Sequence, residues 1–199
     1  MKTKIILASA SPRRKELLRL AVPEFDIITE EVDEDIIDKE LPVHIYVQEL
    51  ALLKASAVAK SIGRRKNTLI IGADTVVYND GEILGKPHDP QEAVDMLGML
   101  SGKTHSVYTG VCVMDSYSAK IVCIKECTNV KFKELSPDDI MADIGTGEPM
   151  DKAGAYGIQG KGALLVSGIE GDYNNVVGLP VSALADLLKN EFEVNCMNR

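Results

Sequence analysis

The sequence of 199 residues lacks any apolar run of the ~18 residues that a membrane-spanning helix needs. It also lacks a signal-peptide pattern at its start, a low-complexity segment and an internal repeat. We therefore expect a soluble, cytoplasmic protein with no membrane partner. A hydrophobic content of 45% is enough for one substantial core, and residues 1–199 are expected to form a single domain with two lobes.

Cysteine and histidine are scarce, and their spacing does not match metal-binding motifs. The four cysteines, Cys112, Cys123, Cys127 and Cys196, include no C-x-x-C pair, and two of them lie in strand-like apolar runs, where a reduced thiol in the core is typical. The three histidines include no H-E-x-x-H motif. We expect neither a zinc site nor a disulfide.

Motifs of several common enzyme classes are incomplete. The string GKT at residues 102–104 resembles the end of a P-loop, but Leu97 stands where that motif needs glycine. The string GKG at residues 160–162 lacks the third glycine of a dinucleotide fingerprint, and no G-x-S-x-G elbow is present. The chain is therefore not a P-loop protein, and no nucleophile motif supports a generic phosphatase.

The charge distribution favours a small anionic ligand over a nucleic acid. The net charge of −8 disfavours binding along a phosphate backbone. Residues 1–66 hold 12 basic and 11 acidic residues, whereas residues 67–199 hold 10 basic and 19 acidic ones. A small polyanion that carries its own divalent metal would suit this balance, because carboxylates can hold the metal and the few cations can hold phosphate.

Hydrophobic periodicity predicts a mixed α/β domain of elongated shape, with a cleft that gathers the loops. A hairpin is expected at residues 79–81 and a functional, glycine-rich loop at 145–162. Inward positions on two long antiparallel strands are Val111, Val113, Val130 and Phe132. Strands are expected at residues 4–8, 25–29, 68–77, 105–114, 120–133 and 163–166, and helices at 12–20, 42–63, 90–100, after Ser136, near Tyr173 and at 181–188.

An anion site is indicated where the first strand meets the first helix, in the string SASPRR at residues 9–14. Ser11 suits the N-cap and the following proline suits the first helical position, so free backbone N–H groups and the positive end of the helix dipole point to where Arg13 and Arg14 can add charge. Phosphate is the natural ligand. An ordinary capped helix with solvated basic residues is the alternative.

Asp74 is the second strong feature, because it interrupts a strand that is otherwise almost wholly apolar. A carboxylate at the end of such a strand costs several kcal/mol to bury without a partner, so a positive group is expected nearby. Thr75 adds a hydroxyl beside it. The structural alternative is that Asp74 caps a turn or pairs with one lysine.

Three further charged residues have two interpretations each. Lys86 precedes a proline in a stiff loop and is either a placed cation or a solvated lysine. Lys54 lies on the apolar side of a helix and either extends to water or meets an anion. Glu34 belongs to an acidic run that is either a solvated loop or a source of oxygen ligands for a divalent cation.

Four ordered motifs together resemble the Maf family of nucleoside triphosphate pyrophosphatases, and the similarity runs through essentially the whole chain. The motifs are LASASPRR at residues 7–14, GADTVV at 72–77, GKP at 85–87 and DKAGAYGIQG at 151–160. The resemblance implies the fold of inosine-triphosphate pyrophosphatases, with two lobes around a long mixed sheet and a central nucleotide cleft. It also implies hydrolysis of a nucleoside triphosphate to the monophosphate and pyrophosphate.

The resemblance also assigns roles to individual residues. Asp74 would be the catalytic acid/base, and with Glu34 it would hold Mg²⁺ or Mn²⁺. Phosphate binding would fall to Ser9, Ser11, Arg14, Lys54 and Lys86. Arg13, Thr75 and Gln159 match positions that set base preference in the branch acting on dTTP and UTP, whereas a sister branch carries tryptophan in place of Arg13.

We therefore expect hydrolysis of dTTP and UTP, with modified pyrimidine nucleotides as further candidates. The amide of Gln159 offers a donor and an acceptor, which suits the imide edge of uracil or thymine. The resemblance also links the chain to septum formation and the arrest of cell division, and a homodimer is compatible with it. A non-enzymatic nucleotide-binding regulator of cell division is the alternative function.

Overall fold

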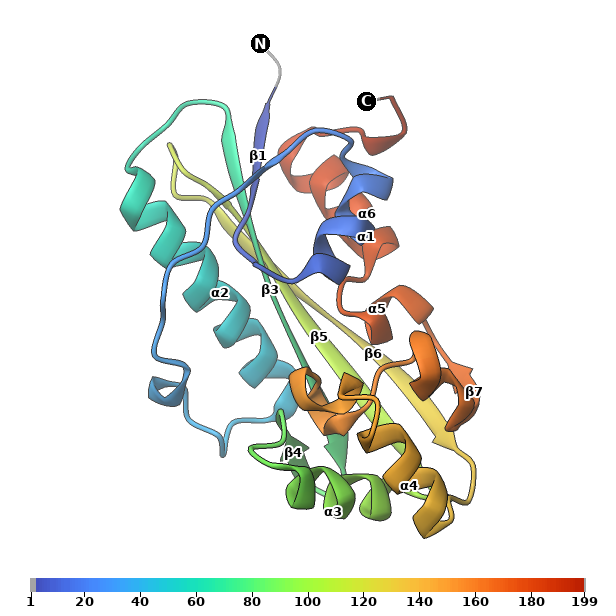
Figure 1. The fold of residues 1–199 in the computed structure, drawn as a ribbon. Coiled ribbons are helices and arrows are strands. Elements are labelled where there is room, and N and C mark those ends of the chain that lie inside the picture. The colour runs from blue at the N-terminus through green and yellow to red at the C-terminus, as the bar shows by residue number, and fades with distance from the viewer. Residues whose placement is uncertain (1–2, 199) are drawn as a thin grey trace. The chain divides into compact units, whose positions relative to one another are not determined.

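The computed structural model describes residues 3–198 and has a mixed α/β fold (Figure 1). The strands are β1 (Lys4–Leu7), β2 (Asp26–Ile27), β3 (Thr68–Asn79), β4 (Glu82–Leu84), β5 (Thr104–Asp115), β6 (Ile121–Phe132) and β7 (Val166–Glu170). The α-helices are α1 (Pro12–Ala21), α2 (Val43–Ile62), α3 (Pro90–Leu100), α4 (Pro137–Ile144), α5 (Tyr173–Val177) and α6 (Val181–Phe192). Short 3₁₀ turns occupy Glu34–Ile36, Glu148–Asp151, Ala153–Ala155, Gly160–Leu164 and Cys196–Asn198.

The strands form one mixed sheet. Their order is β2-β1-β3-β5-β6-β7, and β4 pairs with β3. Strand β1 pairs in parallel with both β2 and β3, whereas β4 pairs antiparallel with β3 and β7 antiparallel with β6. The predicted mixed α/β class is therefore confirmed.

The chain divides into two compact units. Unit 1 contains the residues up to Asp74, the segment Thr109–Glu126 and the residues from Gly178 onward. Unit 2 contains Thr75–Tyr108 and Cys127–Val177. Strand β3 thus passes from unit 1 to unit 2 immediately after Asp74.

In unit 1, helix α2 packs closely on the sheet because two strand positions have no side chain. A Cβ atom at Gly72 on β3 would overlap the carbonyl oxygen of Ala51, and one at Gly110 on β5 would overlap that of Val47. Helix α1 packs against α6 (Figure 1). One apolar cluster of this unit joins β1, α2 and β3 through the buried residues Ile6, Ala8, Ala55, Val58 and Ile70.

In unit 2, helix α3 packs against α4 over a core that includes the buried side chains of Leu97, Leu100, Val130 and Phe132. The predicted hairpin is present, since β3 and β4 pair around Asp80 and Gly81. Both turn residues have positive φ angles, 50° and 94°, as a tight hairpin turn requires.

Most predicted elements are present, but two strands differ. The strand expected at 163–166 is wrong, because residues 160–164 form a 3₁₀ turn and β7 begins only at Val166. Gly162 lies so close to the backbone of Gly157 that a Cβ would be 3.1 Å from its nitrogen, so this segment coils against the loop. The strand expected at 25–29 is shortened to Asp26–Ile27.

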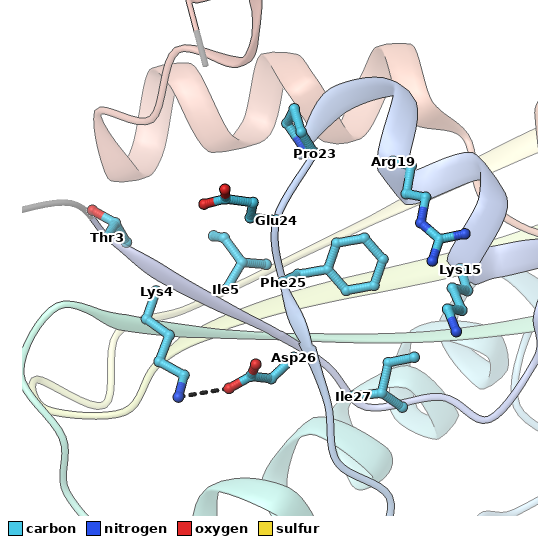
Figure 2. Close-up of a pocket in the computed structure, with 10 residues that line it drawn as sticks. All are labelled: Thr3, Lys4, Ile5, Lys15, Arg19, Pro23, Glu24, Phe25, Asp26 and Ile27. Atoms are coloured by element: carbon cyan, nitrogen blue, oxygen red, sulfur yellow. Dashed lines mark ion pairs between the residues drawn. The ribbon is translucent and has the colours of Figure 1, made fainter.

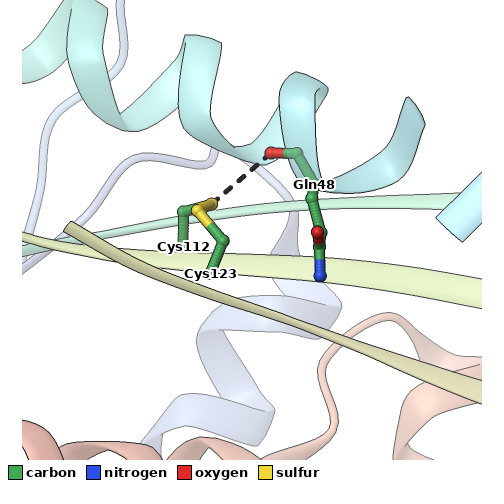
Figure 3. The surroundings of a disulfide bond; sticks show 3 residues. All are labelled: Gln48, Cys112 and Cys123. Carbon is green, nitrogen blue, oxygen red and sulfur yellow. Dashed lines mark hydrogen bonds between the residues drawn. A yellow bond between two sulfur atoms is a disulfide. The ribbon is translucent and has the colours of Figure 1, made fainter. Parts of the chain in front are cut away.

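The prediction that the cysteines are reduced is wrong for Cys112 and Cys123, which form a disulfide (Figure 3). They lie on β5 and β6, which are neighbours in the sheet, and their Cα atoms are 4.0 Å apart. The Sγ atom of Cys112 lies 3.4 Å from the carbonyl oxygen of Gln48 on α2. The two cysteines are 11 positions apart in the sequence, so the absence of a C-x-x-C motif did not exclude their pairing.

Within residues 3–198, no helix combines the length and the apolar character that crossing a bilayer would demand.

Candidate active site

The start of helix α1 in unit 1 has the geometry expected of an anion site. Ser11 is the N-cap, and its hydroxyl accepts a hydrogen bond of 3.4 Å from the backbone N–H of Arg14. Ser9 is buried, and its Oγ accepts from the Ser11 N–H and from Nη1 of Arg14, both at 3.3 Å. In the described part of the chain, the hydroxyl hydrogen of Ser9 has no acceptor, so it can donate to a phosphate oxygen.

The guanidinium of Arg14 is held in place from two sides. Its Nε donates a hydrogen bond of 2.9 Å to the carbonyl oxygen of Gly178, in addition to the bond to Ser9. Burial lowers the pKa of Arg14, while the carboxylate of Asp74 opposes this shift. The group stays cationic, because an arginine keeps its proton at every physiological pH. Arg14 therefore presents a fixed positive charge within the electrostatic reach of Asp74.

Glu34, Lys54 and Asp74 form what we call the charged cluster. The Nζ atom of Lys54 makes an ion pair of 2.8 Å with Oε1 of Glu34 and a second ion pair with Oδ1 of Asp74. The side chains of Lys54 and Asp74 are only 18% and 13% exposed, whereas that of Glu34 is 50% exposed. The expected positive partner of Asp74 is thus present. Asp74 itself lies within β3 and not at its end.

The close packing of α2 on β3 explains why Lys54 reaches Asp74. Gly72 and Asp74 lie two residues apart and so point to the same face of the strand. The backbone of α2 rests on Gly72 through Ala51 and Ala55. Lys54 lies between these two alanines, and its side chain is long enough to span the remaining distance to the carboxylate.

Tyr46 is a neighbour of the charged cluster that was not predicted from the sequence. It is buried on α2, about two turns before Lys54. Burial raises the pKa of Tyr46; Lys39 opposes this shift, and the carboxylates of Asp74 and Glu34 add to it. No motif in the sequence includes Tyr46, and a buried tyrosine on a helix is typical of a core residue.

The donor set of the charged cluster fits a hard divalent cation that arrives with phosphates. Mg²⁺ is usually bound by one or two carboxylates and completes its shell with water and substrate phosphate oxygens. Glu34 and Asp74 both direct a carboxylate oxygen at one cationic group, the ammonium of Lys54. Among residues 3–198, no group of three or more histidine, cysteine or acidic side chains is arranged to hold a metal ion.

Three predicted site residues belong to unit 2. Lys86 is exposed in the loop after β4, and Gln159 is exposed at the start of the Gly160–Leu164 turn. The two segments are joined, because the N–H of Gly154 donates a hydrogen bond of 2.9 Å to the carbonyl oxygen of Gly85. Thr75 is half-buried on β3 and makes contacts within the structure.

The remaining predicted residues belong to unit 1, where Arg13 follows the N-cap of α1 and is half-buried. Within unit 1, the predicted site residues therefore form two groups. The first is Ser9, Ser11 and Arg14, and the second is the charged cluster.

A separate cavity of about 650 Å³ in unit 1 contains none of the predicted site residues (Figure 2). Its lining includes Lys15, Arg19 and Phe25, together with Lys4 and Asp26, which form an ion pair of 2.6 Å. It lies beside α1 and β2, on residues to which the sequence assigned no chemistry.

Comparison with known proteins identifies the family. The sequence matches the family described as Maf-like protein over residues 4–191. The chain belongs to the Maf-like family. The predicted resemblance is therefore confirmed over nearly the full length of the chain.

Relatives within the family are similar along almost their whole length. A protein from Bacillus cytotoxicus named dTTP/UTP pyrophosphatase is 53% identical over 186 residues, which cover 94% of each chain. Proteins of the same name from Clostridioides difficile and Moorella thermoacetica are each 52% identical, and the matches cover 96% and 94% of each chain, respectively. Among solved structures, the Staphylococcus aureus Ham1 protein is similar with a TM-score of 0.44 at 14% identity, covering 65% of this chain and 71% of that one.

Proposed function

We propose that this Maf-like protein hydrolyses dTTP and UTP to the nucleoside monophosphate and pyrophosphate. The observation that carries the proposal is the charged cluster, in which Lys54 pairs with Asp74 and Glu34, in the same unit as the Ser9–Arg14 anion site. The names of the relatives that are about half identical support the same substrates.

The reaction needs a base for water and positive charge for the leaving group. Water attacks the α-phosphorus, and its oxygen forms the new P–O bond. The bond from the α-phosphorus to the bridging oxygen breaks, and pyrophosphate leaves with the electron pair. Asp74 accepts the proton of the attacking water, because it is the less exposed of the two carboxylates beside Lys54.

Fixed donors of unit 1 stabilise the negative charge that develops. Arg14 offers a guanidinium oriented by two hydrogen bonds, and Lys54 offers an ammonium that is already free of most of its water. Preorganised cations of this kind need no rearrangement when charge moves onto the pyrophosphate. The family resemblance gives Lys86 the same role.

Glu34 and Asp74 would hold the divalent cation, Mg²⁺ or Mn²⁺. When bound, such an ion neutralises phosphate charge and lowers the pKa of a bound water. The chain's own contribution is to direct two carboxylates toward one point while Lys54 offsets part of their charge.

Base preference is assigned to Arg13, Thr75 and Gln159 by the family resemblance. Among them, Gln159 has an exposed amide that can donate and accept hydrogen bonds at once. We propose that this amide reads the imide edge of uracil and thymine.

A pyrophosphate-release panel tests the proposal. Purified protein is given each common nucleoside triphosphate, and several modified pyrimidine triphosphates, with Mg²⁺ or Mn²⁺. We expect pyrophosphate from dTTP and UTP at rates well above those from dCTP and the purine nucleotides. Release of orthophosphate alone would reject the proposed bond, and tight binding of nucleotide without turnover would favour a non-enzymatic regulator.

A further inference from the structure

The loop that carries Gln159 is held from inside unit 2, not through Gln159 itself. Gln159 is exposed, and its side chain does not cap the 3₁₀ turn that follows it. Three residues earlier, Tyr156 is buried with 5% exposure. Tyr156 is therefore one of the buried residues that anchor the loop of residues 153–160, together with Ile158.

Tyr156 is anchored by a buried hydrogen bond to a strand. Its hydroxyl and Nε2 of His105 on β5 share a hydrogen bond of 2.7 Å, and His105 is only 3% exposed. The ring of Phe132 on β6 completes a cluster in which all three rings meet edge to face, with centroids 4.7–5.3 Å apart. We call His105, Phe132 and Tyr156 the ring cluster.

Both partners of this hydrogen bond are neutral. Burial raises the pKa of Tyr156, and burial lowers the pKa of His105 to about 4. No charge therefore holds the two groups together. What remains is a directional contact between two rings, which fixes the orientation of Tyr156 as well as its depth.

The backbone just before Tyr156 is fixed as well. Gly154 and Ala155 have φ angles of 66° and 57°, and the left-handed conformation at an alanine costs about 1 kcal/mol or more. A Cβ at Gly154 would lie 2.8 Å from Cγ2 of Val77, and the Gly154 N–H donates a hydrogen bond to the carbonyl oxygen of Gly85. A conformation with this cost persists because the groups around it allow no other.

One polar atom of the ring cluster is buried without a hydrogen-bond partner among residues 3–198. In the part of the chain that the structure describes, Nδ1 of His105 has no hydrogen-bond partner. An unsatisfied buried polar atom costs about 1–3 kcal/mol. A leucine or phenylalanine at this position would remove the unsatisfied nitrogen but would leave the buried hydroxyl of Tyr156 without its partner. The histidine at this position is therefore tied to the hydroxyl of Tyr156.

We propose that His105 and Tyr156 are positioning residues for base selection: their hydrogen bond sets the 153–160 loop so that the Gln159 amide meets the pyrimidine. The inference rests on the proposed function, since it assumes that Gln159 reads the base. It concerns the position of the loop and gives neither residue a contact with substrate.

The test compares base selectivity with binding of a ligand that has no base. In Tyr156→Phe, which removes only the hydroxyl, we expect the ratio of kcat/KM for dTTP to that for dCTP to fall about tenfold, because one directional bond is lost. The inhibition constant of tripolyphosphate, which has phosphates but no base, should stay within about twofold of its wild-type value. Hydrogen exchange of residues 153–160 should become faster.

Two further variants separate positioning from general loosening of the fold. His105→Leu should reproduce the loss of selectivity, and adding Tyr156→Phe to it should cause little further loss, because both remove one hydrogen bond. His105→Gln, which can still reach the hydroxyl, should restore part of the selectivity. Tyr108→Phe is the matched control, with the same chemical change elsewhere on β5, and should leave the ratio unchanged.

Unchanged selectivity in Tyr156→Phe would overturn the inference, as would a parallel loss of selectivity, tripolyphosphate binding and melting temperature. A wild-type protein that releases no pyrophosphate would instead refute the proposed function. In that case hydrogen exchange still decides whether the pair positions the loop, and unchanged exchange of residues 153–160 in Tyr156→Phe would overturn that claim.

Discussion

The charged cluster of unit 1 and the ring cluster of unit 2 use opposite physical means to hold a side chain still. In the charged cluster, Lys54 lies between two carboxylates and remains partly exposed. In the ring cluster, two neutral groups share one hydrogen bond and are almost wholly buried. The first arrangement suits groups that must exchange partners with a charged ligand, and the second suits a part that must not move.

This difference predicts different responses to change. Removing one charge from the charged cluster breaks at least one of its two ion pairs and removes a group to which the proposed reaction assigns a role. Removing the hydrogen bond of the ring cluster leaves all charges in place, so its effects should appear in stability and selectivity. Four experiments examine this contrast, from the largest expected effect to the smallest.

Substitution of Asp74 by asparagine should have the largest effect. The amide cannot accept the proton of water, so kcat should fall about 10³–10⁴-fold, while KM should change only several-fold. Initial rates of pyrophosphate release from dTTP measure both constants. A variant with the wild-type rate would show that the pairing with Lys54 is purely structural.

Substitution of Lys54 by methionine should come next. The methionine keeps the apolar stem but removes the ammonium, so charge on the leaving pyrophosphate is less stabilised and kcat should fall about 10²–10³-fold. The same assay applies. Lys60→Met is the matched control, because Lys60 is an exposed lysine on the same helix. Equal losses in both variants would contradict a specific role for Lys54.

The third effect is a pH dependence of stability that belongs to the ring cluster. The pKa of His105 is lowered from 6.5 to about 4 by burial. Its contribution to stability is fully present above pH 6.5 and is lost as the pH falls toward 4, because the unfolded chain binds the proton first. The loss should reach roughly 3 kcal/mol.

Urea unfolding at several pH values measures this contribution as a difference between proteins. His105→Gln should show a shallower decline between pH 6.5 and 4 than the wild type, whereas His44→Gln, at an exposed position, should keep the wild-type decline. Parallel curves for wild type and His105→Gln would mean that His105 is not held neutral by burial.

The smallest effect is expected for an ion pair outside both clusters. Lys4 and Asp26 pair at 2.6 Å, but their side chains are 50% and 54% exposed. Lys4→Gln should change the free energy of unfolding by about 0.5 kcal/mol or less and leave pyrophosphate release unchanged. A large effect on turnover would show that charge beside the Figure 2 cavity also serves the reaction.

Local patterns in the sequence predicted the helices and strands well, because capping and periodicity act within a few residues. Ser11 and Pro12 marked the start of α1, and a proline after Ser136 marked that of α4. Val111 and Val113 are buried as predicted, and Cys112 between them is buried as well. The strand at 163–166 failed because close packing between glycines, which local pattern does not reveal, coils the chain there.

Contacts between distant segments set the limit of prediction for the site. The sequence indicated that Asp74 needs a positive partner, but only the packing of α2 on Gly72 selects Lys54 for that role. The pairing of Cys112 with Cys123 likewise depends on strands lying side by side. His105 lies on the same face of β5 as Val111, so the alternation of the strand could have indicated that it is buried. No local pattern indicated that Tyr156, on a loop distant in the sequence, is its hydrogen-bond partner.

The most direct test of the central claim, that Asp74 activates water against the α-phosphorus, is hydrolysis of dTTP in ¹⁸O-labelled water by the wild type and Asp74→Asn, followed by mass spectrometry of both products. The wild type should place the label in the monophosphate and none in pyrophosphate. Asp74→Asn should form labelled monophosphate at a rate at least about 10³-fold lower than that of the wild type. Label in pyrophosphate, or labelled monophosphate formed by Asp74→Asn at the wild-type rate, would contradict the claim.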